Sequence, residues 1–261
     1  MTAMNKKKQD ETEKICLDFV KENICTFKNG EVLPKHILEE REYLKEIFNS
    51  AMSNEAGTTF PDFIFDGGFI EHFKITSLLH ESGKGSKFIQ EYRIHDKLFE
   101  KKIEKVCSEH ITKTTSLSPH NHEDLLKSLE KNINHHIDSY HKYENKNKTE
   151  LKKRIFLIHY EDDMFRVKYI GETQPYSVLL DKKFLEVLAQ FSSEIGYFII
   201  VSEDESRVAY PYSGKIEILS EELIDKILME DNFNSHEIVG IGKSITSSRR
   251  TIQGIGINTD V

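Results

Sequence analysis

Two strand-like runs joined by a tight turn, within residues 60–75, constrain the fold more than any other feature of this chain. Aromatic and β-branched side chains dominate both runs, and such side chains favour strands. Between the runs stands Asp66-Gly67-Gly68, and glycine supplies the positive φ angles that a two-residue hairpin turn requires. The segment therefore predicts a β-hairpin.

Each arm of this hairpin carries a carboxylate. If Asp66-Gly67 forms the turn, Asp62 lies opposite Glu71. Opposed side chains share one face of a sheet, so these two can hold a single divalent ion. A turn that is one residue longer pairs Asp62 with His72 instead and sends Glu71 to the other face. The alternative reading is a structural hairpin with two solvated acids.

The composition is that of a soluble globular protein. The chain has 261 residues, enough for one large domain or two small ones. It is 38% hydrophobic and 31% charged, and no apolar run approaches the roughly 20 residues that cross a bilayer. The first residues are basic without an apolar segment behind them, so they are not a secretory signal. We therefore expect a cytoplasmic protein with no membrane partner.

Cysteine usage and charge exclude further classes. Cys16, Cys25 and Cys107 are odd in number and lack CxxC spacing, which argues against a disulfide framework and against a zinc ribbon. With a formal net charge of −8, the surface as a whole does not attract polyanions. Any nucleic-acid binding must come from a local basic patch or from a partner subunit.

Hydrophobic periodicity predicts helices and strands in alternation. Amphipathic helices are predicted over residues 10–27, 34–54, 87–109 and 125–140. Continuous apolar runs at 154–160 and 197–202 predict strands buried on both faces, with a helix capped by Asp181 between them. Ser220 is predicted to cap a last helix, and the chain from Gly240 is expected to be extended or looped. This order predicts an α/β fold.

We expect one α/β domain over residues 1–261, since no repeat or convincing domain boundary is visible. The stretch 111–150 begins rich in Thr, Ser and Pro. It is the best candidate for a helical insertion or for a boundary between lobes.

Helices, then a hairpin with Pro61-Asp62 and Ile70-Glu71 on its arms, then a helix and buried strands: this order resembles the restriction-endonuclease-like superfamily with its PD-(D/E)XK motif. The resemblance covers mainly residues 35–110, with a later strand near 155. It implies a mixed central sheet flanked by helices, with a helical insertion.

The resemblance also implies a function, a metal-dependent nuclease that hydrolyses phosphodiester bonds. Asp62 and Glu71 match the two acids that bind Mg²⁺ or Mn²⁺ in that family. DNA is expected as the substrate more than RNA. By analogy, such a protein acts in restriction or anti-phage defence, and a protein partner or a homo-oligomer would add nucleic-acid surface to this acidic chain.

The lysine of the motif is displaced. Phe73 stands where the lysine is expected, and Lys74, one residue later, points to the opposite face of a regular strand. A second alignment, His72-Phe73-Lys74, keeps the lysine and replaces an acid by histidine. We prefer the first, because two carboxylates suit Mg²⁺ better than a carboxylate and an imidazole.

Three residues are candidates to replace the missing lysine: Lys84, Lys87, or His72 if a bulge turns it inward. The predicted catalytic residues are Asp62, Glu71, His72 and Lys84. The predicted nucleic-acid contacts are Lys84, Lys87 and Lys74, because cationic side chains neutralise phosphates.

Other features are weaker. Glu39, Glu40 or Glu42 on the preceding helix either completes a second metal site or belongs to a solvated face. His135, His136 and His141 share a helix without i,i+4 pairing, so we expect no zinc site there. The main alternative function is a non-catalytic nucleic-acid-binding or assembly subunit that keeps the nuclease fold. A second alternative is a structural hairpin in an unrelated α/β interaction protein.

Overall fold

The computed structural model describes residues 3–26, 34–54, 60–75, 114–116, 122–147, 151–160, 165–169, 172–203, 214–230, 236–240, 242–248 and 251–258. The chain forms two compact units. Unit 1 comprises Met1–Ile75, Leu129–Asp163 and Lys182–Asp231, and unit 2 comprises Thr76–Ser128, Met164–Asp181 and Asn232–Val261. The predicted α/β class, with a mixed sheet flanked by helices, is confirmed.

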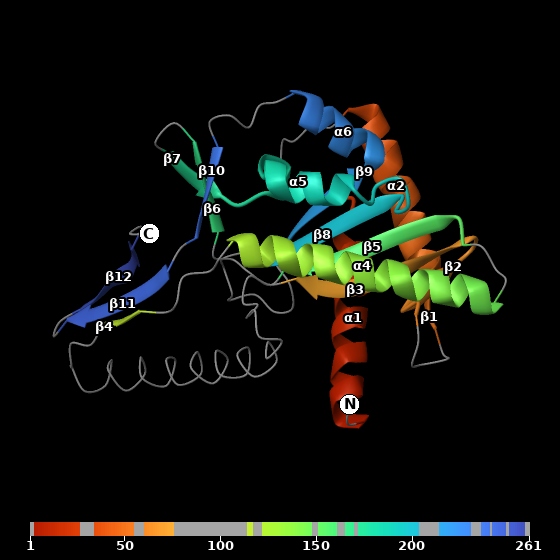
Figure 1. Ribbon diagram of the computed structural model, residues 1–261. Coiled ribbons are helices and arrows are strands. Elements are labelled where there is room, and N and C mark those ends of the chain that lie inside the picture. Colours follow the sequence, from red (N-terminus) through yellow and green to blue (C-terminus); the bar gives the residue numbers. More distant parts are fainter. Residues whose placement is uncertain are drawn as a thin grey trace. The chain divides into compact units, whose positions relative to one another are not determined.

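Unit 1 is built on a six-stranded sheet (Figure 1). Its strands, in spatial order, are β1 (Met52–Ser53), β2 (Phe63–Phe65), β3 (Gly68–Ile75), β5 (Lys153–Tyr160), β8 (Tyr197–Glu203) and β9 (Gly214–Ser220). The central strands β3, β5 and β8 are parallel, and the outer pairs are antiparallel. Both predicted buried strands, β5 and β8, lie in this parallel centre, which explains their continuous apolar runs.

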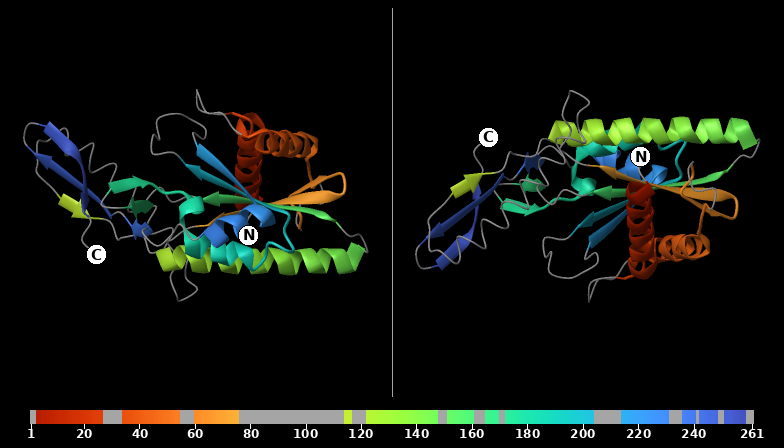
Figure 2. Two further views of the ribbon diagram at one scale, coloured as in Figure 1. Left: turned by 90° about the horizontal axis from the view of Figure 1, so that it is seen from above. Right: turned by 90° about the horizontal axis from the view of Figure 1, so that it is seen from below.

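Helices cover both faces of this sheet. They are α1 (Ala3–Asn23), α2 (Lys35–Ser50), α4 (His122–Asn147, in unit 1 from Leu129), α5 (Lys182–Ala189) and α6 (Glu221–Glu230). Figure 2 shows α1 and α2 on one side of the sheet, and α4, α5 and α6 on the other. The second helix ends at Ser50, before the predicted end at Asn54, because Met52 and Ser53 pair with β2. The Ser220 hydroxyl accepts a hydrogen bond from the Leu223 N–H at 3.3 Å and caps α6 as predicted.

A hydrophobic core lies between the sheet and the α1–α2 side. The α1 residues Cys16, Leu17 and Val20, and Ile24 just after the helix, are buried at helical spacing. They pack in one cluster with Leu44, Ile47 and Phe48 of α2 and with Ile70, Ile155, Leu157, Ile199 and Val201 of the sheet. These strand residues alternate along their strands, so each strand gives every second side chain to this core.

Unit 2 holds two three-stranded antiparallel sheets. One has the order β10 (His236–Gly240), β6 (Phe165–Tyr169), β7 (Glu172–Pro175), and the other β12 (Thr251–Asn258), β11 (Gly242–Ser248), β4 (Thr114–Ser116). The buried carboxylate of Asp181 accepts a hydrogen bond from the Tyr176 hydroxyl at 2.8 Å. The same oxygen lies 2.5 Å from Nε2 of His122, at the start of α4. The chain from Gly240, predicted to be extended or looped, forms strands β11 and β12, so the extended alternative is confirmed.

Several predictions stay open. The predicted helix over 87–109, together with Lys84, Lys87 and Cys107, lies outside the described residues. Residues 111–150 include β4 and α4, and their role as an insertion or lobe boundary, like the single domain over 1–261, stays a prediction. In the part of the chain that the structure describes, no helix is both long and apolar enough to span a membrane.

Candidate functional site

The β2–β3 hairpin has the two-residue turn that the sequence predicts. Phe65 pairs with Gly68 and Phe63 with Ile70, and Gly67 adopts a φ of 73°. Gly68 is also required for space, because a Cβ there would lie 2.3 Å from the carbonyl oxygen of Lys153 on β5. Moving away from the turn, the residues after Phe63 and Ile70 are Asp62 and Glu71. The register therefore places the two acids side by side.

Asp62 and Glu71 each accept a hydrogen bond from a backbone N–H of the opposite arm of the hairpin. Glu71 Oε2 accepts a hydrogen bond from the Asp62 N–H at 3.0 Å, and Asp62 Oδ2 accepts one from the His72 N–H at 2.8 Å. Strand β2 begins at Phe63, so β3 continues past the end of its partner. The carboxylate of Asp62 thus accepts the hydrogen bond of the His72 N–H, which would have bonded to the backbone of β2 if that strand were longer. We call Asp62 and Glu71 the acid pair.

Helix α4 adds a histidine to the acid pair. His136 Nδ1 lies 2.7 Å from Glu71 Oε1. The ring of His136 stacks on Phe73, with ring centroids 4.8 Å apart and planes inclined by 13°. Phe73 in turn meets Phe156 of β5 edge to face, with centroids 5.5 Å apart. The position where the motif expects lysine is thus occupied by an aromatic ring that supports His136.

A third carboxylate comes from α1. Glu13 is 8% exposed and lies one turn before Cys16 in the buried stripe of that helix. Its charge contributes to raising the pKa of both Asp62 and Glu71. The sequence pointed instead to α2, where Glu39 and Glu42 are exposed and Glu40 is half-buried. Glu39 lies 3.2 Å from Lys35 in a surface ion pair, as expected of a solvated face.

Burial controls the electrostatics of this cluster. It raises the pKa of Asp62 to about 8, assisted by the charges of Glu71 and Glu13. It also raises the pKa of Glu71 to about 8 and lowers the pKa of His136 to about 4. Each group is therefore pushed toward its neutral form. A Glu71 carboxyl O–H that donates to Nδ1 of neutral His136 agrees with both shifts.

His72 and Lys74 lie on the other face of β3. The strand pairs with β5 residue by residue from Gly68 to Ile75, so its side chains alternate and these two face α1. Burial lowers the pKa of His72 to about 3, and among the described residues its Nε2 has no hydrogen-bond partner. The charge of Lys74 contributes to this lowering. The catalytic role predicted for His72 and the phosphate contact predicted for Lys74 stay predictions.

A divalent metal ion is what the resemblance implies, and the donors fit one in kind. Asp62 and Glu71 offer hard carboxylate oxygens, and Mg²⁺ is commonly held by one or two carboxylates together with water and phosphate oxygens. As the side chains stand, however, the described residues contain no group of three or more His, Cys, Asp or Glu that would hold an ion. The acid pair would therefore supply two ligands to an ion. Glu71 would give up its contact with His136 to bind it.

Comparison with known proteins adds no relative. No family model matches the chain, and neither the curated proteins nor the solved structures include a match.

Proposed function

We propose that this protein is a metal-dependent nuclease with a restriction-endonuclease-like core. The single observation that carries the proposal is the acid pair, which the register of the β2–β3 hairpin sets side by side at the end of β2. The order of elements supports it: α2, then β1, β2 and β3, then α4 as the crossover to the parallel strand β5.

The acid pair, with Glu71 buried and Asp62 half-buried, is suited to exchanging protons for a cation. Both carboxyls have a pKa of about 8, so at neutral pH they hold protons that a divalent ion would displace. When bound, such an ion neutralises charge at a scissile phosphate and acidifies water, which hydrolysis of a phosphodiester needs. Asp62 and Glu71 would hold it, and the Asp62 and His72 N–H groups already fix the orientation of both carboxylates.

His136 then has two roles in this scheme. Its Nδ1 holds Glu71 in place in the absence of an ion. Its side chain is 17% exposed, so an approaching phosphate can reach the ring. A histidine from α4 thus supplies the polar group next to the acids that Phe73 cannot supply. DNA remains the expected substrate ahead of RNA, and Mg²⁺ or Mn²⁺ the expected ion.

One observation favours the second candidate, a non-catalytic nucleic-acid-binding or assembly subunit with the same fold. Phe73 fills the lysine position and is packed between His136 and Phe156. A site that activates water normally keeps a polar group at such a position. A subunit that only binds nucleic acid has no need of one.

Cleavage and metal binding together test the proposal. Purified protein is incubated with labelled linear, circular and single-stranded DNA and with RNA, in Mg²⁺, in Mn²⁺ or in EDTA. The variants are Asp62→Asn and Glu71→Gln, which keep the shape and the hydrogen-bond acceptors. Asp225→Asn, at an exposed acid on α6, is the matched control. Calorimetry measures the affinity for Mn²⁺ in the same four proteins.

We expect metal-dependent cleavage by the wild type and by Asp225→Asn, and a loss of about 100-fold or more in both acid-pair variants. Their affinity for Mn²⁺ should fall as well. Cleavage that survives both substitutions contradicts the proposal. Metal binding through Asp62 and Glu71 with no cleavage of any substrate favours the non-catalytic subunit.

A further inference from the structure

Helix α4 touches the site at two points along one flank. His136 contacts Glu71. One turn earlier, the side-chain N–H of Asn132 donates to the carbonyl of Lys74 at 3.3 Å. Residues four apart share a helix face. This flank of α4 therefore runs along β3 next to the acid pair.

A row of hydrogen-bond donors follows the same flank, and we call it the donor stripe: His135, Ser139, Lys142 and Lys146. Steps of four, three and four residues keep these side chains in one row. The His and both Lys are exposed; Ser139 is half-buried and its hydroxyl donates to the carbonyl of His135 at 2.9 Å, so the three exposed side chains are the donors that face solvent. The ring of His135 lies 5.4 Å from that of His136, so the row begins beside the acid pair.

The two flanks of α4 differ in charge. From Lys131 to Lys146 this row carries no carboxylate; Asp138 borders it on the solvent side, and Asp124 lies on its line nearer the start of the helix. The opposite flank carries Glu130 and Glu144, and there His141 lies 3.4 Å from Glu194 of the α5–β8 connection. A merely solvated helix face mixes both signs. In α4 the cationic flank is the one next to the acid pair.

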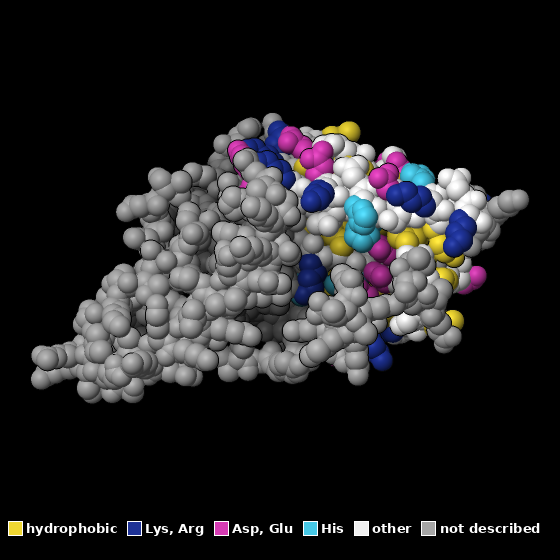
Figure 3. All heavy atoms as spheres, turned by 60° about the horizontal axis from the view of Figure 1, so that its bottom comes forward, with side chains coloured by type: hydrophobic (Ala, Val, Ile, Leu, Met, Phe, Trp, Pro, Cys, Tyr) yellow, Lys and Arg dark blue, Asp and Glu magenta, His cyan; other side chains and the backbone are white. Residues whose placement is uncertain are grey.

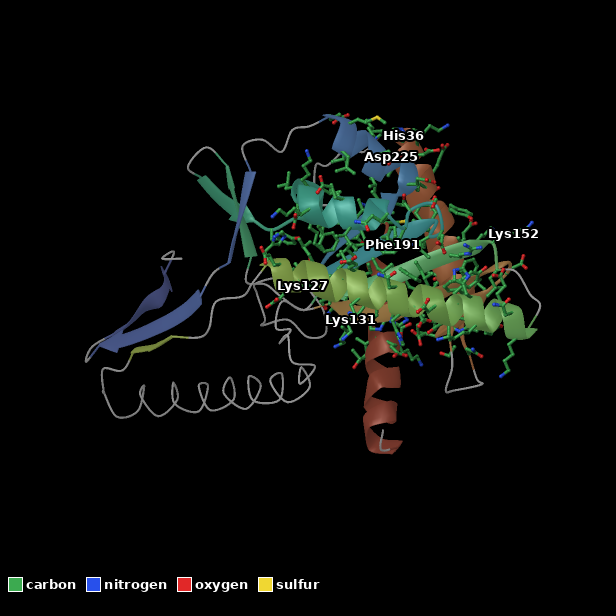
Figure 4. All side chains as sticks on the ribbon, in the orientation of Figure 1. His36, Lys127, Lys131, Lys152, Phe191 and Asp225 are labelled. Carbon is green, nitrogen blue, oxygen red and sulfur yellow. The ribbon has the colours of Figure 1, made fainter. Side chains whose placement is uncertain are left out.

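Lys131 extends the cationic flank, since it lies one turn before His135 and is exposed. Figure 4 shows it along the lower edge of α4 in that view. In Figure 3, Lys and Arg side chains in dark blue and His side chains in cyan recur across the described part of the face turned forward, beside acidic side chains in magenta. The helix dipole explains a cation such as Lys146 in the last turn, but it does not explain Lys131, which lies far from that end.

We propose that the donor stripe, with Lys131, binds the phosphodiester backbone of a nucleic-acid strand and leads it to the acid pair. The inference rests on the proposed function, since it takes the acid pair as the reaction centre. From His135 to Lys146 the helix rises about 17 Å, a length over which one strand of a B-form duplex carries about five phosphates. Contacts to phosphates carry no sequence information, so a stripe that binds only the backbone confers no sequence preference.

Binding is measured apart from catalysis. Fluorescence anisotropy follows labelled duplex DNA, single-stranded DNA and single-stranded RNA in EDTA, at several salt concentrations. The test variant is Lys142→Ala with Lys146→Ala. The matched control is Lys183→Ala with Lys226→Ala, which removes two exposed lysines from α5 and α6. Thermal unfolding checks that both double variants fold like the wild type.

The stripe variant should weaken binding roughly tenfold and reduce the slope of log affinity against log salt by about 1.4 to 1.8, which corresponds to two lost phosphate contacts. The control should bind like the wild type. Equal affinity and slope in the two double variants overturn the inference, as does a wild type that binds none of the three nucleic acids at low salt. Stripe-dependent binding without cleavage leaves the inference standing and counts against the nuclease. Cleavage with binding that does not depend on the stripe supports the nuclease and overturns the inference. The nucleic acid that binds most tightly shows whether DNA or RNA is preferred.

Discussion

Replacing Glu71 by Gln should flatten the dependence of stability on pH above pH 6.5. In the unfolded chain Glu71 titrates near its ordinary pKa of 4.5, whereas in the folded protein its pKa is about 8. Between these values the folded state binds more protons than the unfolded state, so the free energy of unfolding falls as pH rises. Asp62, with a pKa raised from 3.8 to about 8, acts in the same direction.

The buried histidines act oppositely and at lower pH. His72 and His136 have pKa values lowered from 6.5 to about 3 and about 4. Their cost to the folded state therefore grows as pH falls through 6.5 and fades as pH rises from 6.5 to 7.5. Both proteins contain these histidines, so the difference between the wild type and Glu71→Gln in this window reports on the two carboxyls.

Each carboxyl that still holds its proton contributes a slope of about 1.4 kcal/mol per pH unit. From pH 6.5 to 7.5 the wild type should therefore lose up to about 2.7 kcal/mol, and Glu71→Gln at most half of this. Loss of the Glu71 charge also relieves Asp62, which reduces the slope further. The difference corresponds to about 4 °C in Tm for a chain of this size.

Thermal or urea unfolding in EDTA at pH 6.5, 7.0 and 7.5 measures these slopes. Asp138→Asn, at an exposed acid on α4, is the control and should keep the wild-type slope. If Glu71→Gln and the wild type lose stability in parallel across this window, the carboxyl of Glu71 is not held protonated, and the reasoning is refuted.

Two further predictions concern packing around the site. Phe73→Ala should destabilise the fold by about 3–5 kcal/mol, because it removes a buried ring that supports His136 and Phe156; urea unfolding measures this, and a cost near that of Tyr43→Ala, at a ring 39% exposed, would count against it. Gly68→Ala should cost about 2 kcal/mol, because its Cβ would lie 2.3 Å from the backbone of Lys153. Gly67→Ala has open space for its Cβ and meets only the strain of a φ of 73°, about 1 kcal/mol. Thermal unfolding should therefore give Gly68→Ala a lower Tm than Gly67→Ala.

The hairpin is the part of the site that the sequence predicts best. A two-residue turn is a local property of Asp66 and Gly67, and once it is set, the alternation of strands dictates which residues oppose each other. The adjacency of Asp62 and Glu71 follows from this count, and so does the displacement of Lys74 to the other face. Long apolar runs likewise predict β5 and β8, since burial on both faces leaves a strong signal.

The residues that join the acid pair from helices were not predictable in this way. Glu13 lies one helical turn before a buried cysteine, a spacing that was available as a signal. Nevertheless, only the packing of α1 against the sheet brings it near residues about 50 and 60 positions away. The sequence pattern brings out His136 only as a zinc-ligand candidate beside its helical neighbours. Which face of α4 meets β3 depends on tertiary packing, and periodicity defines a buried face without naming its partner.

The short length of β2 has a consequence for the solubility of the protein. Beyond Phe63, the amide of His72 is covered by the Asp62 carboxylate, and the carbonyl of Lys74 is covered by the Asn132 side chain. A strand margin with uncovered amides and carbonyls recruits strands from other molecules. Asp62, proposed as a metal ligand, thus also reduces self-association through the edge of β3. Asp62→Ala would remove both properties at once, whereas Asp62→Asn keeps an oxygen over the amide.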